Sequence, residues 1–508
     1  MNLLAQWEQR VVPWSWVWAA VIAAVGACVA LLPIDWVILL VGGTALAILT
    51  LVRPEYGIYA LVFAVPFGSV RQFQLSGINV NACDACVALV VASWLGALVV
   101  QRRIVVPHLP LLLPLIGFIF VLVLSWLAAL SLTVSLKETL KWVQLLLVYL
   151  FIGSTFDEDR VRRTMTLVLI AGVLASLLGI YQFFGRVGPD GFLWHTPVGL
   201  FMRAYGTFQQ PNPFGGYVGM VAPIAYGLWL VSFGIEKGQV PLFGMWRFVT
   251  NTTLYAALTG LMAVAMLMTW SRGAILGFLA AFVVINMRRS RRVAAAFVVV
   301  MVLLIGLGAL QLLPEVITQR FLDFLPFLSI PDVNAVEVNP VNFALVQRLA
   351  HWTAGWDMFA AHPWTGVGIG NYPLVYPLYA PPAWPDAMGH AHNYYLNMAA
   401  EAGLAGLFAY LMLWAVIFWQ ILRATYRLRG YALGIALGVF GVLVHLSVHN
   451  LVDNLYVHNM YLHIAILLGC VAALVRSQTA LGGTSGCGLD CADRGAPVSA
   501  RSGAHASD

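Results

Sequence analysis

Long apolar runs recur along almost the whole chain, and they constrain its fold more than any other feature. Runs long enough to cross a bilayer fall near residues 13–32, 35–52, 55–72, 84–101, 109–131, 138–154, 164–185, 212–234, 252–270, 272–288, 293–313, 398–422, 431–449 and 458–475. A membrane-spanning helix needs about 20 such residues, and lipid forces the backbone to satisfy its own hydrogen bonds. We predict an all-α polytopic integral membrane protein with about 14 transmembrane helices. Because several runs are short, about 12 is the alternative, with one early pair re-entrant.

The composition excludes several classes of protein. Charged residues make up 9% of the chain and hydrophobic residues 61%, whereas a soluble domain has about 25% charged residues. The net charge of +6 comes from basic residues scattered at segment ends, so no nucleic acid partner is expected. Cys83 and Cys86 form a single C-x-x-C. A disulfide there would need an oxidising compartment, and a structural zinc site needs four ligands, so no metal site is predicted.

Basic clusters predict the orientation of the chain. With the N-terminus in the cytoplasm, RRSRR at 288–292 and RATYRLR at 423–429 both lie inside, as the positive-inside rule requires. Both termini are then cytoplasmic. This topology divides the chain into a first part of the bundle (1–313), one long periplasmic loop containing helices (314–392), the last part of the bundle (393–476) and a disordered cytoplasmic tail (477–508).

Arginines on the opposite, outer side break this bias. Arg203 follows the seventh run, Arg272 ends the ninth, and Arg320 and Arg348 lie in the long loop. A guanidinium presents a planar fork of donors that matches phosphate oxygens. A single interfacial arginine is more often a snorkelling anchor, so the signal lies in four of them sharing one side of the membrane.

The long loop also supplies histidines. VNFALVQRLAHWTAGWDMFAAHP predicts an amphipathic helix ending before Pro363, and it places Arg348 and His351 on one face. His392 stands at the outer membrane boundary, where the chain re-enters a helix. A histidine near arginines stays neutral and can act as a general base, although a lone interfacial histidine is more often only hydrogen-bonded. We predict a site for a diphosphate leaving group and a hydroxyl nucleophile.

Two further patterns are weaker. GVGIGN is not a dinucleotide fingerprint, because no βαβ unit surrounds it. HLSVHNLVDNLYVHNMYLH holds His445, His449, Asp453, His458 and His463. This cluster could bind metal or relay protons, but structural polar packing is the prediction.

The sequence around these residues resembles that of bacterial O-antigen ligases. HNYYLNMAAEAGLAG matches the family signature of His and Asn, nine residues, Gly, two residues and a small residue, here His392, Asn393, Gly403 and Gly406. RLAHWTAGWDMFAAHPWTGVGIGNY, RAYGTFQQPNPFGGY and WSRGA are similar to other motifs of the ligase and polymerase superfamily.

The resemblance implies an inverting glycosyltransferase of the inner (cytoplasmic) membrane, with a periplasmic active site. Such a ligase moves O-antigen from undecaprenyl diphosphate to lipid A–core in lipopolysaccharide assembly and needs neither metal nor cofactor. It implies that His392 is the general base, with Arg348 and Arg272 as the essential arginines. Arg203, Arg320 and Asn393 are expected to bind substrate; Arg320 rests on the topology alone.

Other functions fit the same residues. An O-antigen polymerase shares the donor, and a protein O-oligosaccharyltransferase would use a Ser or Thr acceptor. A lipid or glycan transporter is the alternative without covalent chemistry, but it usually shows internal repeats and midplane charges.

Overall fold

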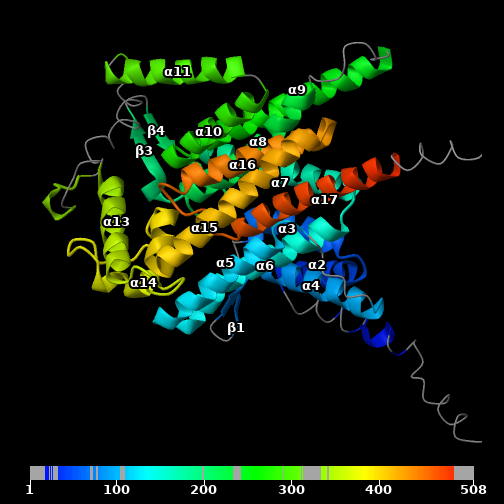
Figure 1. Cartoon of the computed structure of the whole chain (residues 1–508), viewed down its shortest axis with the longest axis horizontal. Coiled ribbons are helices and arrows are strands. Elements are labelled where there is room, and N and C mark those ends of the chain that lie inside the picture. Colours follow the sequence, from blue (N-terminus) through cyan, green and yellow to red (C-terminus); the bar gives the residue numbers. More distant parts are fainter. Residues whose placement is uncertain are drawn as a thin grey trace, which may run out of the picture. The chain divides into compact units, whose positions relative to one another are not determined.

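Helices dominate the computed structural model (Figure 1). It describes residues 16, 18–21, 23, 26, 33–68, 73–75, 78–102, 109–196, 199–232, 242–289, 291–310, 312, 333–339 and 342–485. The elements are α2 (Ile34–Val52), α3 (Glu55–Phe67), β1 (Phe73–Leu75), β2 (Ile78–Val80), α4 (Ala82–Val100), α5 (Leu112–Leu124), η3 (Ser125–Ala128), α6 (Leu132–Thr155), α7 (Glu158–Gly185), η4 (Asp190–Phe192), β3 (Leu193–Thr196), β4 (Gly199–Met202), α8 (Pro211–Ser232), α9 (Leu242–Leu267), α10 (Arg272–Arg289), α11 (Arg291–Ala309), η6 (Val333–Ala335), α13 (Phe343–Ala361), α14 (Tyr372–Val375), η7 (Tyr376–Leu378), α15 (Tyr394–Arg427), α16 (Gly430–His449) and α17 (Met460–Ser485).

The apolar runs fold into helices, and the chain is a multi-pass membrane protein. Six helices in the described part are long and apolar enough to cross a membrane: α4, α7, α8, α15, α16 and α17, the last counted over Met460–Thr479. Shorter apolar helices fall on other predicted runs, so the count of 14 stays a prediction. Most of the first run lies outside the described residues, as do residues 486–508 of the predicted tail.

The chain forms two compact units. The first consists of Met1–Ala60 with Ala85–Ile104. Within it, the Ser93 hydroxyl donates to the Leu51 carbonyl at 2.9 Å, and a Cβ at Gly57 would lie only 2.4 Å from Val90. Glycine therefore lets the helices of this unit approach closely, as in other membrane bundles.

The second unit, Leu61–Asp84 with Val105–Asp508, contains the helices that matter for function. At its centre α8 and α16 lie against each other. A Cβ at Gly227 would lie 2.3 Å from the Gly434 carbonyl oxygen, and one at Gly438 would lie 2.5 Å from the Ile224 Cα. The backbones of α8 and α16 are therefore in direct contact.

Residues 363–367, which precede α15 in the chain, pack against a break in that helix and hydrogen-bond to it. Gly403, at φ +65°, interrupts the helical backbone of α15, and Gly366, also at φ +65°, lies beside it. The Val367 N–H donates to the Ala400 carbonyl (2.9 Å) and the Leu404 N–H to the Pro363 carbonyl (2.7 Å). Gly366 of GVGIGN and Gly403 of the His392–Gly406 signature thus lie at one contact between the two segments.

The predicted helix over residues 341–363 is confirmed as α13, which ends at Ala361 before Pro363. In Figure 1, α13 lies across the beginning of α15. Two short hairpins, β1–β2 and β3–β4, differ from the all-α prediction. Strands of three and four residues are too short to produce a recognisable alternation in a sequence. Within the described residues, no disulfide joins Cys83 to Cys86, and both are buried.

Candidate active site

His392 lies in a tightly fastened turn immediately before α15. Its backbone is left-handed, at φ +52°, a conformation that is uncommon outside glycine and that concentrates at functional sites. The His392 N–H donates to His390 Nδ1 at 3.1 Å, and its carbonyl accepts from Trp352 Nε1 at 3.4 Å. The preceding Ala391 N–H donates to the Asn397 side chain at 3.0 Å. These hydrogen bonds fix the backbone at residues 391 and 392, and they thereby fix where the His392 side chain begins.

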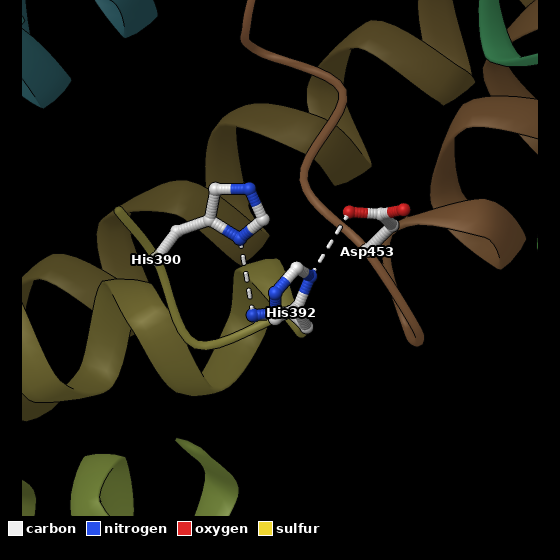
Figure 2. A group of neighbouring side chains, drawn as sticks. All are labelled: His390, His392 and Asp453. Atoms are coloured by element: carbon white, nitrogen blue, oxygen red, sulfur yellow. Dashed lines mark hydrogen bonds and ion pairs between the residues drawn. The ribbon is translucent and has the colours of Figure 1, made fainter. Parts of the chain in front are cut away.

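Asp453, in the loop between α16 and α17, faces this ring. His392 Nδ1 lies 3.5 Å from Asp453 Oδ1, and Figure 2 shows the carboxylate meeting the imidazole from the opposite loop. Burial alone would raise the pKa of Asp453, but the hydrogen bond from His392 and the charge of Arg348 hold it well below its usual range. An ionised carboxylate can only accept, so Nδ1 carries the hydrogen. Nε2 of His392 is then the nitrogen able to take a proton.

Two neutral histidines pack around His392. Burial, together with neighbouring charges, lowers the pKa of His390 to about 3, and burial lowers the pKa of His351 to about 4. The His351 ring stacks on Tyr376 (4.6 Å between centroids) and meets the His392 ring edge-on (5.5 Å). Both histidines remain uncharged at neutral pH, so they position His392 without competing for protons.

Three arginines from distant parts of the chain converge here. Arg203 follows β4, Arg272 begins α10 and Arg348 lies on α13. Burial, together with the positive charges of Arg348 and Arg272, lowers the pKa of Arg203 to about 10. Arg203 Nε donates to the Thr269 carbonyl at 2.9 Å. Arg203 therefore stays charged at neutral pH, and like charges gathered in this way favour an anionic ligand.

The structure therefore brings together Arg203, Arg272, Arg348 and His392, all identified from the sequence. Arg320 lies outside the described residues. Asn393 caps α15, because its side-chain oxygen accepts from the Tyr395 and Leu396 N–H groups, both at 3.1 Å. His362, at the other end of α13, is roughly 20 Å along the helix from Arg348.

Asp453 and His390 are site residues that sequence reasoning did not assign to the site. Asp453 pairs with a histidine 61 positions away, and no local spacing predicts such a contact. Its polar neighbours in the predicted cluster pack inside the bundle: His445 and His449 are buried, and a Cβ at Gly219 would lie 2.0 Å from the His445 ring. The signal that the sequence offered was an acidic residue, Asp453, within the histidine cluster.

His390, His392 and Asp453 could also hold a metal ion. Their donor atoms lie within 4.8 Å of one another, and two imidazoles with a carboxylate are ligands that zinc accepts. The positive charge of Arg348, which acts on both His390 and Asp453, would repel a metal cation at this place. The predicted absence of a metal requirement stays a prediction.

Comparison with known families gives one match. A family model described as O-antigen ligase matches residues 257–411. Residues 257–411 are thus similar to the O-antigen ligase family. The matched segment contains Arg272, Arg348 and His392, and Arg203 and Asp453 reach the same site from outside it. No curated protein matches the chain.

Proposed function

We propose that the protein is an inverting O-antigen ligase that moves O-antigen from undecaprenyl diphosphate onto lipid A–core. The family match supports a function of the O-antigen ligase or polymerase type, acting on lipid-linked glycans. The observation that carries the finer proposal is the meeting of three arginines with the His392–Asp453 pair. Such a site suits a diphosphate leaving group and a hydroxyl nucleophile.

His392 activates the acceptor in this scheme. Nε2 takes the proton of an acceptor sugar hydroxyl, whose oxygen forms a bond to the anomeric carbon of the donor. The bond from that carbon to the diphosphate oxygen breaks in the same displacement, so the anomeric configuration inverts. Asp453 stabilises the imidazolium that results, because its carboxylate faces Nδ1 at 3.5 Å.

The arginines stabilise the leaving group. Undecaprenyl diphosphate departs with negative charge developing on its bridging oxygen, and fixed cations aimed at that charge lower the barrier. Arg348 acts electrostatically on both Arg203 and Asp453, so it is near enough to serve both the proposed diphosphate subsite and the base. Arg320 and Asn393 remain predicted substrate-binding residues.

The proposed setting is the bacterial inner membrane, with the site on the periplasmic side and both termini cytoplasmic. Residues 314–392 form the periplasmic loop between the two parts of the bundle in this topology. A lipid-linked donor and a lipid acceptor explain why the site lies at the beginning of the apolar helix α15. No metal or other cofactor is part of the proposed mechanism.

An O-antigen polymerase is the nearest second candidate. It would use the same diphosphate subsite and the same base, with a growing glycan as acceptor. A protein O-oligosaccharyltransferase would differ only in taking a Ser or Thr hydroxyl. The residues named here act on the donor and on a generic hydroxyl, so the acceptor must be identified by assay.

The test is transfer in vitro from a purified lipid-linked glycan to lipid A–core. We expect His392→Ala and Arg348→Ala each to lower kcat by about 100-fold or more. His362→Ala is the matched histidine control, since His362 is exposed at the far end of α13. Arg186→Ala is the arginine control, since Arg186 is exposed at the end of α7. Both controls should keep full activity.

Full activity in both site variants would overturn the site. Transfer only to a peptide, or only extension of the glycan, would overturn the ligase assignment and keep the site. Loss of activity on adding a chelator, restored by a divalent cation, would instead assign a metal to His390, His392 and Asp453.

A further inference from the structure

A cavity lies between helices at the end of the bundle remote from His392. The cap residue of α15, Asn393, follows His392 directly, and the last turns of α15 line the cavity. From Gly403 to Arg427 the helix rises roughly 36 Å, slightly more than the hydrocarbon thickness of about 30 Å. The cavity and the candidate active site therefore belong to opposite faces of the membrane.

The cavity combines apolar walls with a basic rim. It measures about 460 Å³ and lies between the start of α5, the end of α6 and the last halves of α15 and α17. Leu111, Leu468 and Val471 form part of its wall, and Arg423, Arg427 and Arg476 are its charged residues. None of the described residues that line it is acidic. Its size is that of an ordinary ligand pocket.

The three arginines have different surroundings. Arg476 donates to the carbonyls of Gly153 and Phe156 and is fixed in the wall. Arg423 lies over the ring of Trp419, 4.4 Å from its centroid. Arg423 and Arg427 are four residues apart and so share one face of α15, and both side chains are exposed. Two exposed guanidinium groups thus stand at the mouth of an apolar hollow.

An amphiphilic anion fits this arrangement better than other ligands do. A small soluble anion would leave the apolar wall unused, and a zwitterionic lipid would bring an amine toward three cations. Basic hollows between helices at this depth are suited to lipid headgroups. We propose that the cavity binds an anionic glycerophospholipid, with its phosphodiester at Arg423 and Arg427 and the upper part of one acyl chain against the apolar wall.

Native mass spectrometry of the purified full chain in detergent tests this, with phosphatidylglycerol and phosphatidylcholine as probes. Each surface arginine contributes roughly fivefold to the binding of an anionic lipid. We therefore expect R423Q/R427Q to weaken phosphatidylglycerol binding by tenfold or more. Val475 also lines the cavity. In Val475→Phe a larger side chain occupies part of the apolar space without altering the charge, so it should also weaken binding.

Arg429→Gln is the matched control, because Arg429 is an exposed arginine near the same helix end that does not line the cavity. It should change binding less than twofold, and inorganic phosphate should not displace the lipid. Unchanged melting temperatures without lipid show that the variants fold. Equal binding of phosphatidylcholine, equal loss in Arg429→Gln, displacement by phosphate, or no effect of Val475→Phe would each overturn the proposal.

Discussion

At the scale of single residues, the pair of His392 and Asp453 determines how the site handles protons. In the proposed mechanism, Asp453 fixes the hydrogen on Nδ1, 3.5 Å away, and balances the charge that His392 gains. In Asp453→Asn the amide keeps the size but loses the charge, so we expect kcat to fall by about 100-fold with little change in KM. The measurement is transfer activity across pH, with Asp453→Glu as the variant that restores the charge. A uniform loss of thermal stability in both variants would mean a structural role instead.

His351 gives a prediction about pH and stability. Burial lowers the pKa of His351 to about 4, below the ordinary value of about 6.5. The unfolded chain therefore binds this proton first as the pH falls, so stability is full above about pH 6.5 and declines toward pH 4. In His351→Phe the ring remains and the titration is removed, so the melting temperature should fall less between pH 7.5 and 5.0. His362→Phe, at an exposed site, should leave the decline unchanged; an unchanged decline in His351→Phe would refute the prediction.

Site residues could be predicted where the sequence around them carries the signal, but not where their role depends on a contact with a distant segment. Arg203, Arg272 and Arg348 stood out because each opposes the charge bias of the membrane. His392 stood out because it begins a helix at the boundary and carries the family signature. Asp453 could not be paired with it, because the contact joins two loops separated by α15 and α16. Only the folded chain shows that contact.

At the scale of elements, the cap of α15 can be tested. Asn393 accepts hydrogen bonds from two N–H groups of the first turn. Asn393→Ala should therefore lower stability by about 1 kcal/mol, whereas Asn393→Ser should retain most of it. Melting temperature and transfer activity are measured for both variants. If Asn393→Ser is stable and active, the residue acts through the helix; if it is stable and inactive, Asn393 contacts substrate as the sequence suggests.

The break in α15 is a second element with a definite prediction. A Cβ at Gly403 would lie 2.3 Å from the Trp364 backbone, in a left-handed conformation. Gly403→Ala should thus cost about 2 kcal/mol or more, seen as a melting temperature lower by several degrees. Gly117→Ala is the control, because a Cβ at that helical glycine meets nothing within 4 Å. Equal stability of the two variants would contradict the packing described here. The sequence placed Gly403 in the family signature and Gly366 in GVGIGN, but it did not show that the two segments meet.

At the scale of the whole molecule, the helices followed from hydrophobic length, whereas the two hairpins did not. Apolar runs such as 431–449 and 212–234 agree within two residues with α16 (Gly430–His449) and α8 (Pro211–Ser232). The physical reason is that lipid permits little besides helix along such runs. The side of the membrane on which each loop lies depends instead on whether an even or an odd number of spans precedes it. One run wrongly counted as a span would therefore reverse the side of every later loop. The orientation therefore rests on the arginine clusters.

The orientation can be tested at the two ends of α15. Asp386 is exposed in the segment before His392, and Arg429 is exposed just beyond Arg427. In a chain whose six native cysteines are replaced, a cysteine at position 386 should react in intact cells with a maleimide that crosses only the outer membrane. A cysteine at position 429 should react only after the inner membrane is opened. This follows because α15 is long enough to separate the two compartments and the cluster at 423–429 favours the cytoplasm. Labelling of position 429 alone in intact cells would put the site on the cytoplasmic side and overturn the periplasmic transfer reaction.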